Sequence, residues 1–395
     1  MSSSDSSYPV DKPSLSELAA FFLRLGTTAF GGPAAHIAIM EDELVRRRGW
    51  ISREKFLDML GASNLIPGPS SSELAIHIGY LLGGWRGLFV AGICFILPAA
   101  CMVGALAWAY VHFGKLPAVA GILYGIKPVV IAVVLQALWG LGRTAIKTWI
   151  IAIVGFLSVG LAAWGLHPLL LLLIAGGAVI LADQALQSGA KIEFAPLSIL
   201  RSGMRWPKSL AAAISAASAA VAPPSLASLL LIFLKFGAVI FGSGYVLLAF
   251  LRADLVIHRG WLTDAQLIDS IAIGQVTPGP VFTTATFIGY LLRGTPGAVV
   301  ATVGIFLPAF LLVAVSGPLL PRIRKSKIAG SFLDGVIVAS LALMAVVSWQ
   351  LARASVVDLL TAILFIGSLF LLLRFRLNSA WLILIGALAG ALVRV

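Results

Sequence analysis

The tripeptide Pro-Gly-Pro occurs twice in the chain, at Pro67–Pro69 and at Pro278–Pro280, which sets an offset of 211 residues (278 minus 67). The same offset pairs Arg24 with Lys235, Gly31 with Gly242 and Asp58 with Asp269, and from Gly79 onward it is 210. A register kept across most of each half is not coincidence, and a repeat this long is a doubled domain, since solenoid units are much shorter. The chain is therefore two fused copies of one unit.

The composition places both copies in a membrane. Hydrophobic residues make up 60% of the chain and charged residues 11%, too few charges to cover a surface that faces water. The apolar stretches that can cross a bilayer run over residues 88–111, 118–141, 149–164, 168–182, 298–320, 328–351, 356–373 and 380–392. We therefore expect a multi-pass protein surrounded by the lipid bilayer.

The basic residues indicate how the two copies are oriented. The net charge of +12 does not point to nucleic acid, because no soluble basic domain carries it. In the connection after the first helix, the first copy is the more basic, with Arg46, Arg47, Arg48, Arg53 and Lys55 against Arg252 and Arg259 in the second copy. In the next connection the second copy is the more basic, with Arg322, Arg324, Lys325 and Lys327 against Lys115 in the first copy. Because Lys and Arg mark the cytoplasmic side, equivalent loops are predicted on opposite faces. The halves are then inverted repeats, a transporter arrangement.

The chain divides into four predicted segments. Residues 1–13 form a polar, Ser-rich tail that we expect to be disordered and not a cleavable signal, residues 14–182 the first repeat, residues 183–225 a basic linker, and residues 226–395 the second repeat. Inversion needs an odd number of crossings before the second copy. The weakly apolar residues 209–222 are predicted to supply the additional crossing. The alternative is that they form a surface helix and that the Pro-Gly-Pro region makes the number of crossings odd.

Shorter, broken elements are predicted before each Pro-Gly-Pro. In the first copy they are residues 14–30, 34–48 and 53–64, with a break at Gly31-Gly32-Pro33, and in the second copy 226–241, 245–258 and 264–275, with a break at Gly242-Ser243-Gly244. Ser14 and Glu17 have the spacing of a capping box. Irregular backbone at membrane depth is tolerated only where protein buries it or a cavity adjoins it. The predicted fold is an all-α polytopic membrane protein of two inverted-topology repeats, with broken or re-entrant helices at the Pro-Gly-Pro turns.

Hydrogen-bond donors gather at the two turns. Two prolines end the preceding helix, glycine allows the backbone to turn, and a new helix begins, so each turn presents a helix N-terminus that attracts anions. The neighbouring polar side chains are Asn64, Ser70 and Ser71 in the first copy, and Gln275, Thr277, Thr283 and Thr284 in the second. Two such ends brought together would suit a tetrahedral oxyanion. The alternative is that each turn is only a tight hairpin capped by its hydroxyls.

Cations and titratable groups near the turns are further candidates. Arg24 and Lys235 interrupt apolar helices at the same repeat position, so we expect them at the substrate site, with snorkelling to an interface as the alternative. Glu73, His36 and His77 lie near the breaks of the first copy only, and we select them as candidates for proton coupling. The alternatives are that Glu73 satisfies its helix dipole and that the histidines serve packing or hydrogen bonding.

No motif indicates an enzyme or a cofactor. The sequence has no phosphate loop, no His-Glu-x-x-His and no nucleophile elbow with partners, and Cys94 and Cys101 are expected to pack as small hydrophobic residues and not to bind a metal. Without a Walker motif, transport would be coupled to an ion gradient or to an external protein.

Several motifs carry a family resemblance. They are Phe-Gly-Gly-Pro at 30–33, Arg-Arg-Arg-Gly-Trp-Ile at 46–51, Leu-Ile-Pro-Gly-Pro at 65–69, His-Ile-Gly-Tyr at 77–80 and Gln-Val-Thr-Pro-Gly-Pro-Val-Phe-Thr-Thr at 275–284. The chain resembles the chromate ion transporter family in its long form of two fused domains, over about residues 15–395. The family motifs put the functional weight on Gly31, Gly32, Pro33, Pro67, Gly68, Pro69, Pro278, Gly279 and Pro280.

The resemblance implies export of chromate across the inner membrane and chromate resistance, driven by the membrane potential or a proton gradient. Sulfate is a similar tetrahedral dianion, so sulfate or other oxyanion uptake or exchange stays open, as does a membrane receptor or scaffold that binds an anion without moving it. Ser70 stands where the family often has Asn, which leaves fine substrate preference open. The sequence leaves the oligomeric state open, with a homodimer as one candidate assembly.

Overall fold

The computed structural model describes residues 13–30, 32–63, 66–114, 116–187, 224–240, 246–375, 377 and 379–394. Every regular element in these ranges is a helix, which confirms the predicted class. Most of the predicted 1–13 tail, the whole 209–222 crossing, and Gly31, Asn64 and Gly242 lie outside the described residues.

The helices of the two halves correspond in chain order, except that η5 of the second half has no counterpart among the described helices of the first. The first half contains α1 (Leu15–Thr28), α2 (Gly32–Met40), η1 (Glu41–Arg47), α3 (Arg53–Ser63), α4 (Ser70–Phe113), α5 (Pro117–Ala145), α6 (Trp149–Ala163) and α7 (Pro168–Gln187). The second half contains α9 (Leu226–Val239), α10 (Leu247–Leu251), η4 (Arg252–His258), α11 (Asp264–Val276), η5 (Val281–Thr283), α12 (Thr284–Lys325), α13 (Lys327–Ser355), α14 (Leu359–Phe375) and α15 (Ser379–Arg394). The duplication read from the sequence is thus repeated element by element.

Local sequence explains where several elements begin. Ser14 and Glu17 form the predicted capping box at the start of α1, and Thr263 and Gln266 form one at the start of α11. The short elements predicted over 34–48 and 245–258 each end in wider π-helix, η1 and η4, a detail that the sequence did not indicate. Each π-helix closes at an Arg-Gly-Trp sequence in which the arginine lies over the tryptophan ring.

Within the described residues, five helices are long and apolar enough to cross a membrane, by length and composition: α4, residues 119–145 of α5, residues 168–186 of α7, residues 281–315 and α13. The stretches predicted at 149–164, 356–373 and 380–392 form α6, α14 and α15, which are shorter apolar helices. Large apolar side chains cover the outside of the protein, as Phe156 and Trp164 show, each 79% exposed. Such an exterior fits a lipid surrounding.

Helices α4 and α12 are each bent back on themselves near their start. At Gly84 and Gly294 the φ angles are 58° and 61°, a left-handed conformation that glycine adopts without steric cost. Residues eight apart in a straight helix are separated by about 12 Å, yet a Cβ added at Gly79 would overlap Gly87, and the same holds for Gly289 and Gly297. Each long helix is therefore a short segment packed against a longer one. The sequence predicted a helix from Ser70 and a span from about residue 88, without this reversal.

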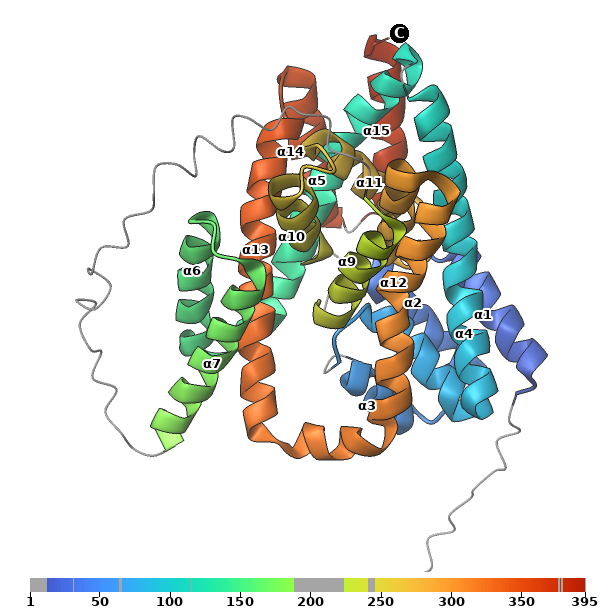
Figure 1. Ribbon diagram of the computed structural model, residues 1–395, viewed down its shortest axis with the longest axis vertical. Coiled ribbons are helices and arrows are strands. Elements are labelled where there is room, and N and C mark those ends of the chain that lie inside the picture. The colour runs from blue at the N-terminus through green and yellow to red at the C-terminus, as the bar shows by residue number, and fades with distance from the viewer. Residues whose placement is uncertain are drawn as a thin grey trace, which may run out of the picture.

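The equivalent long helices of the two halves run antiparallel. Early residues of α4 meet late residues of α12, since the rings of Phe89 and Phe310 stack with centroids 5.8 Å apart, and Tyr110 meets Phe287 at the other end. Helices α5 and α13 are likewise antiparallel, because Lys147 pairs with Asp334 at one end while Tyr124 donates to Asp358 at the other. Figure 1 shows the same directions, with α4 and α13 rising and α5 and α12 descending.

The C-terminal helices of each half pack on the other half. Helices α6 and α7 lie against α13, whereas α14 and α15 lie against α5 (Figure 1). Small residues make this exchange close: a Cβ added at Gly125 would overlap the carbonyl oxygen of Gly386, and one at Gly335 would overlap Ala175. Gly125 and Gly335 are equivalent positions at the offset of 210. Neither half is therefore a self-contained packing unit.

Filling one of these close contacts should destabilise the protein. Gly125→Val places branched atoms against the α15 backbone, so we expect the free energy of unfolding to fall by about 1–3 kcal/mol, measured as apparent melting temperature in detergent. Gly140→Val is the matched control on the same helix, since a Cβ there meets nothing within 4 Å. Equal melting temperatures for both variants would contradict the exchanged packing.

Candidate functional site

Each Pro-Gly-Pro turn is hydrogen-bonded to the end of the first helix of the opposite half. The Gly68 N–H donates to the Ile240 carbonyl after α9 at 2.7 Å, and the Gly279 N–H donates to the Ala29 carbonyl after α1 at 3.1 Å. Both donors and both acceptors are related by the offset of 211, so the two bonds are equivalent. Gly68 and Gly279 have φ angles of 140° and 92°, which favour glycine. These two N–H groups are therefore used in joining the halves.

In the first half, a buried histidine connects the two turns. The Nε2 of His36 lies 3.2 Å from the Ala29 carbonyl oxygen, which also accepts the Gly279 N–H, and its Nδ1 lies 3.3 Å from the Ser71 hydroxyl. Because the carbonyl only accepts, Nε2 carries the hydrogen, and Ser71 donates to Nδ1 in the neutral ring. The ring is fully buried and meets the edge of Phe95.

Glu73 lies in the first helical turn of α4, next to the first Pro-Gly-Pro turn. Its side chain is buried and has no hydrogen-bond partner among the described residues. The side chain is 0% exposed, and neither carboxyl oxygen has a partner among the described residues. Its carboxyl occupies the space beside Gly68, where an added Cβ would collide with it. The Ser72 hydroxyl on the same helical turn is also buried and unpartnered within the described part of the chain. The first turn thus holds polar groups that the fold does not satisfy.

In the second turn the hydroxyls serve the local backbone. Thr283 and Thr284 each donate to a carbonyl three residues earlier, at 2.8 Å, and Thr277 donates to the Ile273 carbonyl at 3.0 Å. This is the geometry of the capping alternative. Apolar Leu247 stands at the position that corresponds to His36. The halves share a backbone plan but differ in polarity.

The paired cations on α1 and α9 have partners within their own halves. Arg24 pairs with Glu43 at 3.5 Å, and Lys235 pairs with Asp254 at 2.7 Å. These pairs are equivalent at the offset of 211, and both acidic partners lie on the π-helices. The Arg24 side chain is 58% exposed, in keeping with the snorkelling alternative. The structure thus joins both cations to the π-helices and gives them no contact with the turns among the described residues.

The remaining predicted residues are found close to the turns. Gly32 and Pro33 begin α2, Pro67 and Pro69 flank Gly68 in the first turn, and Ser70 begins α4. His77 follows Glu73 by one helical turn and is 7% exposed. Gln275 lies at the end of α11, with Pro278 and Pro280 buried in the second turn.

Sequence reasoning missed a buried ion pair between the halves. Asp269 on α11 accepts from the Tyr110 hydroxyl at 2.9 Å and pairs with Lys127 at 3.0 Å, both from the first half. From the sequence, Asp58 and Asp269 were open to two interpretations, pairing with basic partners or capping the packing of broken helices, and no partner was named. The signal was available, because Lys127 is a lone cation within the apolar stretch 118–141, and such cations in a membrane usually have a partner.

These features define a multi-pass membrane protein of two homologous halves joined at polar turns, the general form of a transporter. The family model for chromate transporters matches residues 16–181 and 227–391, so the chain belongs to the chromate transporter family, in its long form with two family domains. It is therefore a transport protein and not an enzyme.

Curated relatives match either nearly the whole chain or one half of it. A chromate transport protein of Cupriavidus metallidurans is 34% identical over 387 residues, covering 96% of this chain and 93% of that protein. One of Pseudomonas aeruginosa is 34% identical over 392 residues, covering 95% and 92%. An uncharacterised transporter of Bacillus subtilis is 32% identical over 168 residues, which is 41% of this chain but 94% of that protein. No solved structure matches the chain.

The ion pair at Asp269 gives a prediction on stability. Lys127→Gln leaves a carboxylate that is 5% exposed with only a tyrosine partner, so we expect a loss of up to about 3 kcal/mol, read as a lower melting temperature. Adding Asp269→Asn to Lys127→Gln removes the unpaired charge and should restore most of the loss. If the double variant is no more stable than the single one, the pair does not hold the halves together.

Proposed function

We propose that the protein exports chromate across the inner membrane by secondary active transport and so confers chromate resistance. The observation that carries this proposal is the similarity, over nearly the whole chain, to proteins that are themselves named as chromate transport proteins. The polar first turn supports it, because buried donors beside a helix N-terminus suit a tetrahedral dianion.

The proposed substrate site centres on the first Pro-Gly-Pro turn. There α4 begins at Ser70 with its N-terminus facing the turn, and the unsatisfied Ser72 hydroxyl lies in the same helical turn. A buried hydroxyl without a partner costs free energy, and an anion that accepts its hydrogen bond would recover that cost. The second turn, whose hydroxyls and Gly279 N–H are already bonded, is proposed to brace the site through Ala29.

Glu73 is proposed to couple transport to protons. An isolated buried carboxylate is costly, whereas the neutral acid is not, and a carboxylate would also repel a dianion. Glu73 would accordingly hold a proton while substrate is bound and release it with the substrate on the outside, so that the membrane potential drives export and the proton gradient opposes it. His77 follows Glu73 by one turn of α4, and His36 on α2 contacts Ser71 and is joined to the second turn through Ala29.

The two halves are proposed to lie in the membrane with inverted topology. The antiparallel course of α4 against α12, and of α5 against α13, supports this arrangement, as does the alternation of basic loops in the sequence. In alternating access, the protein would then change between two equivalent states. In each state, one Pro-Gly-Pro turn packs against the first helix of the other half.

Everted membrane vesicles test the transport function. We expect labelled chromate to accumulate inside them, saturably and only with an energised membrane, since their interior corresponds to the outside of the cell. Excess sulfate tests the alternative of a general oxyanion carrier. Full competition of sulfate with labelled chromate would favour that alternative. Binding without any flux would leave the anion receptor and overturn the proposal.

Gly68→Leu should abolish this flux. A side chain at Gly68 meets the Glu73 carboxyl and requires a φ angle that leucine rarely adopts, a strain of about 1–3 kcal/mol at the proposed site. Gly160→Leu is the control, because a Cβ there meets nothing within 4 Å. Both variants should insert at normal levels, measured by immunoblot of membranes. Normal flux in Gly68→Leu would remove the turn from the mechanism.

Glu73→Gln separates coupling from binding. A neutral amide cannot release a proton, so chromate should still bind while its flux no longer responds to an imposed pH gradient. The measurement compares initial flux with and without that gradient at constant membrane potential. Glu73→Thr, which copies the second half, should behave in the same way. An unchanged response to the gradient would exclude Glu73 as the coupling group.

A further inference from the structure

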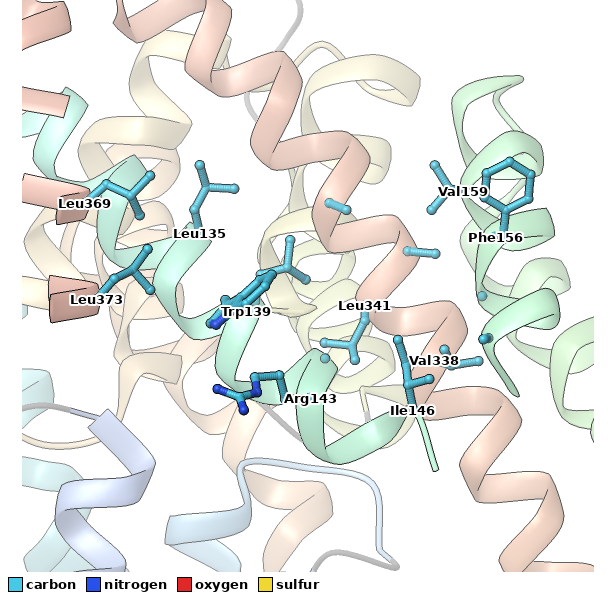
Figure 2. Close-up of a pocket in the computed structure, with 16 residues that line it drawn as sticks. Leu135, Trp139, Arg143, Ile146, Phe156, Val159, Val338, Leu341, Leu369 and Leu373 are labelled. Carbon is cyan, nitrogen blue, oxygen red and sulfur yellow. The ribbon is translucent and has the colours of Figure 1, made fainter. Parts of the chain in front are cut away.

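A groove of about 680 Å³ lies far along the chain from both turns, between α5, α6, α13 and α14. Figure 2 shows its lining, with Trp139 on α5, Phe156 on α6, Leu341 on α13 and Leu369 on α14 among the labelled residues. The lining is aliphatic and aromatic except for Arg143. A chromate ion would find one cation and otherwise no polar partner here, so this groove is not a second oxyanion site.

The groove lies where a lipid chain would meet the protein near the edge of the bilayer. Trp139 is 61% exposed and Trp149, at the start of α6, is 62% exposed. Tryptophan gathers at the level of the lipid head groups. Arg143 is in the last turn of α5, at the same end of the helix bundle. Figure 2 shows Arg143 one helical turn from Trp139 along α5. The apolar lining therefore extends from the head-group level into the membrane.

Arg143 is a charged side chain at the level of these tryptophans, and the other described residues leave it unpaired. It makes no ion pair or hydrogen bond with the described residues, whereas its neighbour Lys147 is paired with Asp334 at 2.7 Å. Under the proposed topology this end faces the cytoplasm, because it is also the end at which α12 leads into α13. Anionic lipids give the cytoplasmic leaflet a negative surface that attracts basic side chains.

We propose that this groove binds an anionic glycerophospholipid, with one acyl chain along the apolar lining and the phosphate at Arg143. Acyl chains are as apolar as leucine, so in a bilayer the groove gains little by preferring one chain to another. An empty groove would lose its dispersion contacts, which a chain restores. The selection therefore comes from the head group, through Arg143. Only the assignment to the cytoplasmic leaflet depends on the proposed topology.

Quenching of tryptophan fluorescence by brominated lipids tests this site. The full-length protein is reconstituted in phosphatidylcholine vesicles that contain either brominated phosphatidylglycerol or brominated phosphatidylcholine at equal fraction. We expect stronger quenching by the anionic lipid, and Trp139→Phe should remove most of that difference. Trp349→Phe, at the equivalent position of the second half and 67% exposed, should leave it in place.

Substitution of the cation decides the role assigned to it. Arg143→Gln should reduce the preference for the anionic lipid about fivefold, the effect of one basic side chain near a charged lipid surface. Arg143→Lys should retain the preference, and Arg353→Gln is the matched control in the second half. Equal quenching by both lipids in the unaltered protein would overturn the proposal. A preference for the anionic lipid that survives Arg143→Gln would also overturn it. So would a loss of preference in Arg143→Gln that is explained by a change in oligomeric state.

Discussion

The fold depends on two equivalent hydrogen bonds, in which the glycine N–H of each Pro-Gly-Pro turn meets the carbonyl that ends the first helix of the other half. A backbone turn at membrane depth cannot leave its polar groups unpaired, since no water replaces the missing partner. Each half supplies what the other lacks, so the turns are built only when the halves are assembled. The exchange of C-terminal helices, with α15 on α5 and α7 on α13, joins the halves a second time.

The two halves share one backbone arrangement but differ in the polar side chains around their Pro-Gly-Pro turns. Around the first turn lie His36, Ser71 and Glu73, whereas Leu247 replaces the histidine in the second half and the threonines there bond to their own backbone. A symmetric scaffold with one polar turn can bind and release a charged substrate from one site while both halves rearrange. The two copies thus share their backbone geometry, while the unsatisfied Ser72 hydroxyl and Glu73 carboxyl belong to the first copy.

The duplication, the helical class and the ends of several helices could be predicted from the sequence, because glycine, proline and capping residues act locally. Ser14 with Glu17 is an example. The partners of Lys127 and the exchange at Gly125 could not, because an apolar helix carries no record of which neighbour it packs against. The second turn shows the same limit, since a threonine that caps its own helix and one that faces a ligand are identical in sequence. Composition alone likewise does not distinguish a helix reversed at Gly84 from a straight one.

The central claim is that two equivalent halves are opposed across the membrane. Arg46→Cys and Ile257→Cys, introduced singly after Cys94→Ala and Cys101→Ala, test it directly, since the two sites are equivalent at the offset of 211 and their side chains are 67% and 60% exposed. The measurement is labelling of intact cells by a thiol reagent that does not cross membranes. We expect position 257 to react in intact cells and position 46 only after permeabilisation. Labelling of both positions from the same side would contradict the central claim.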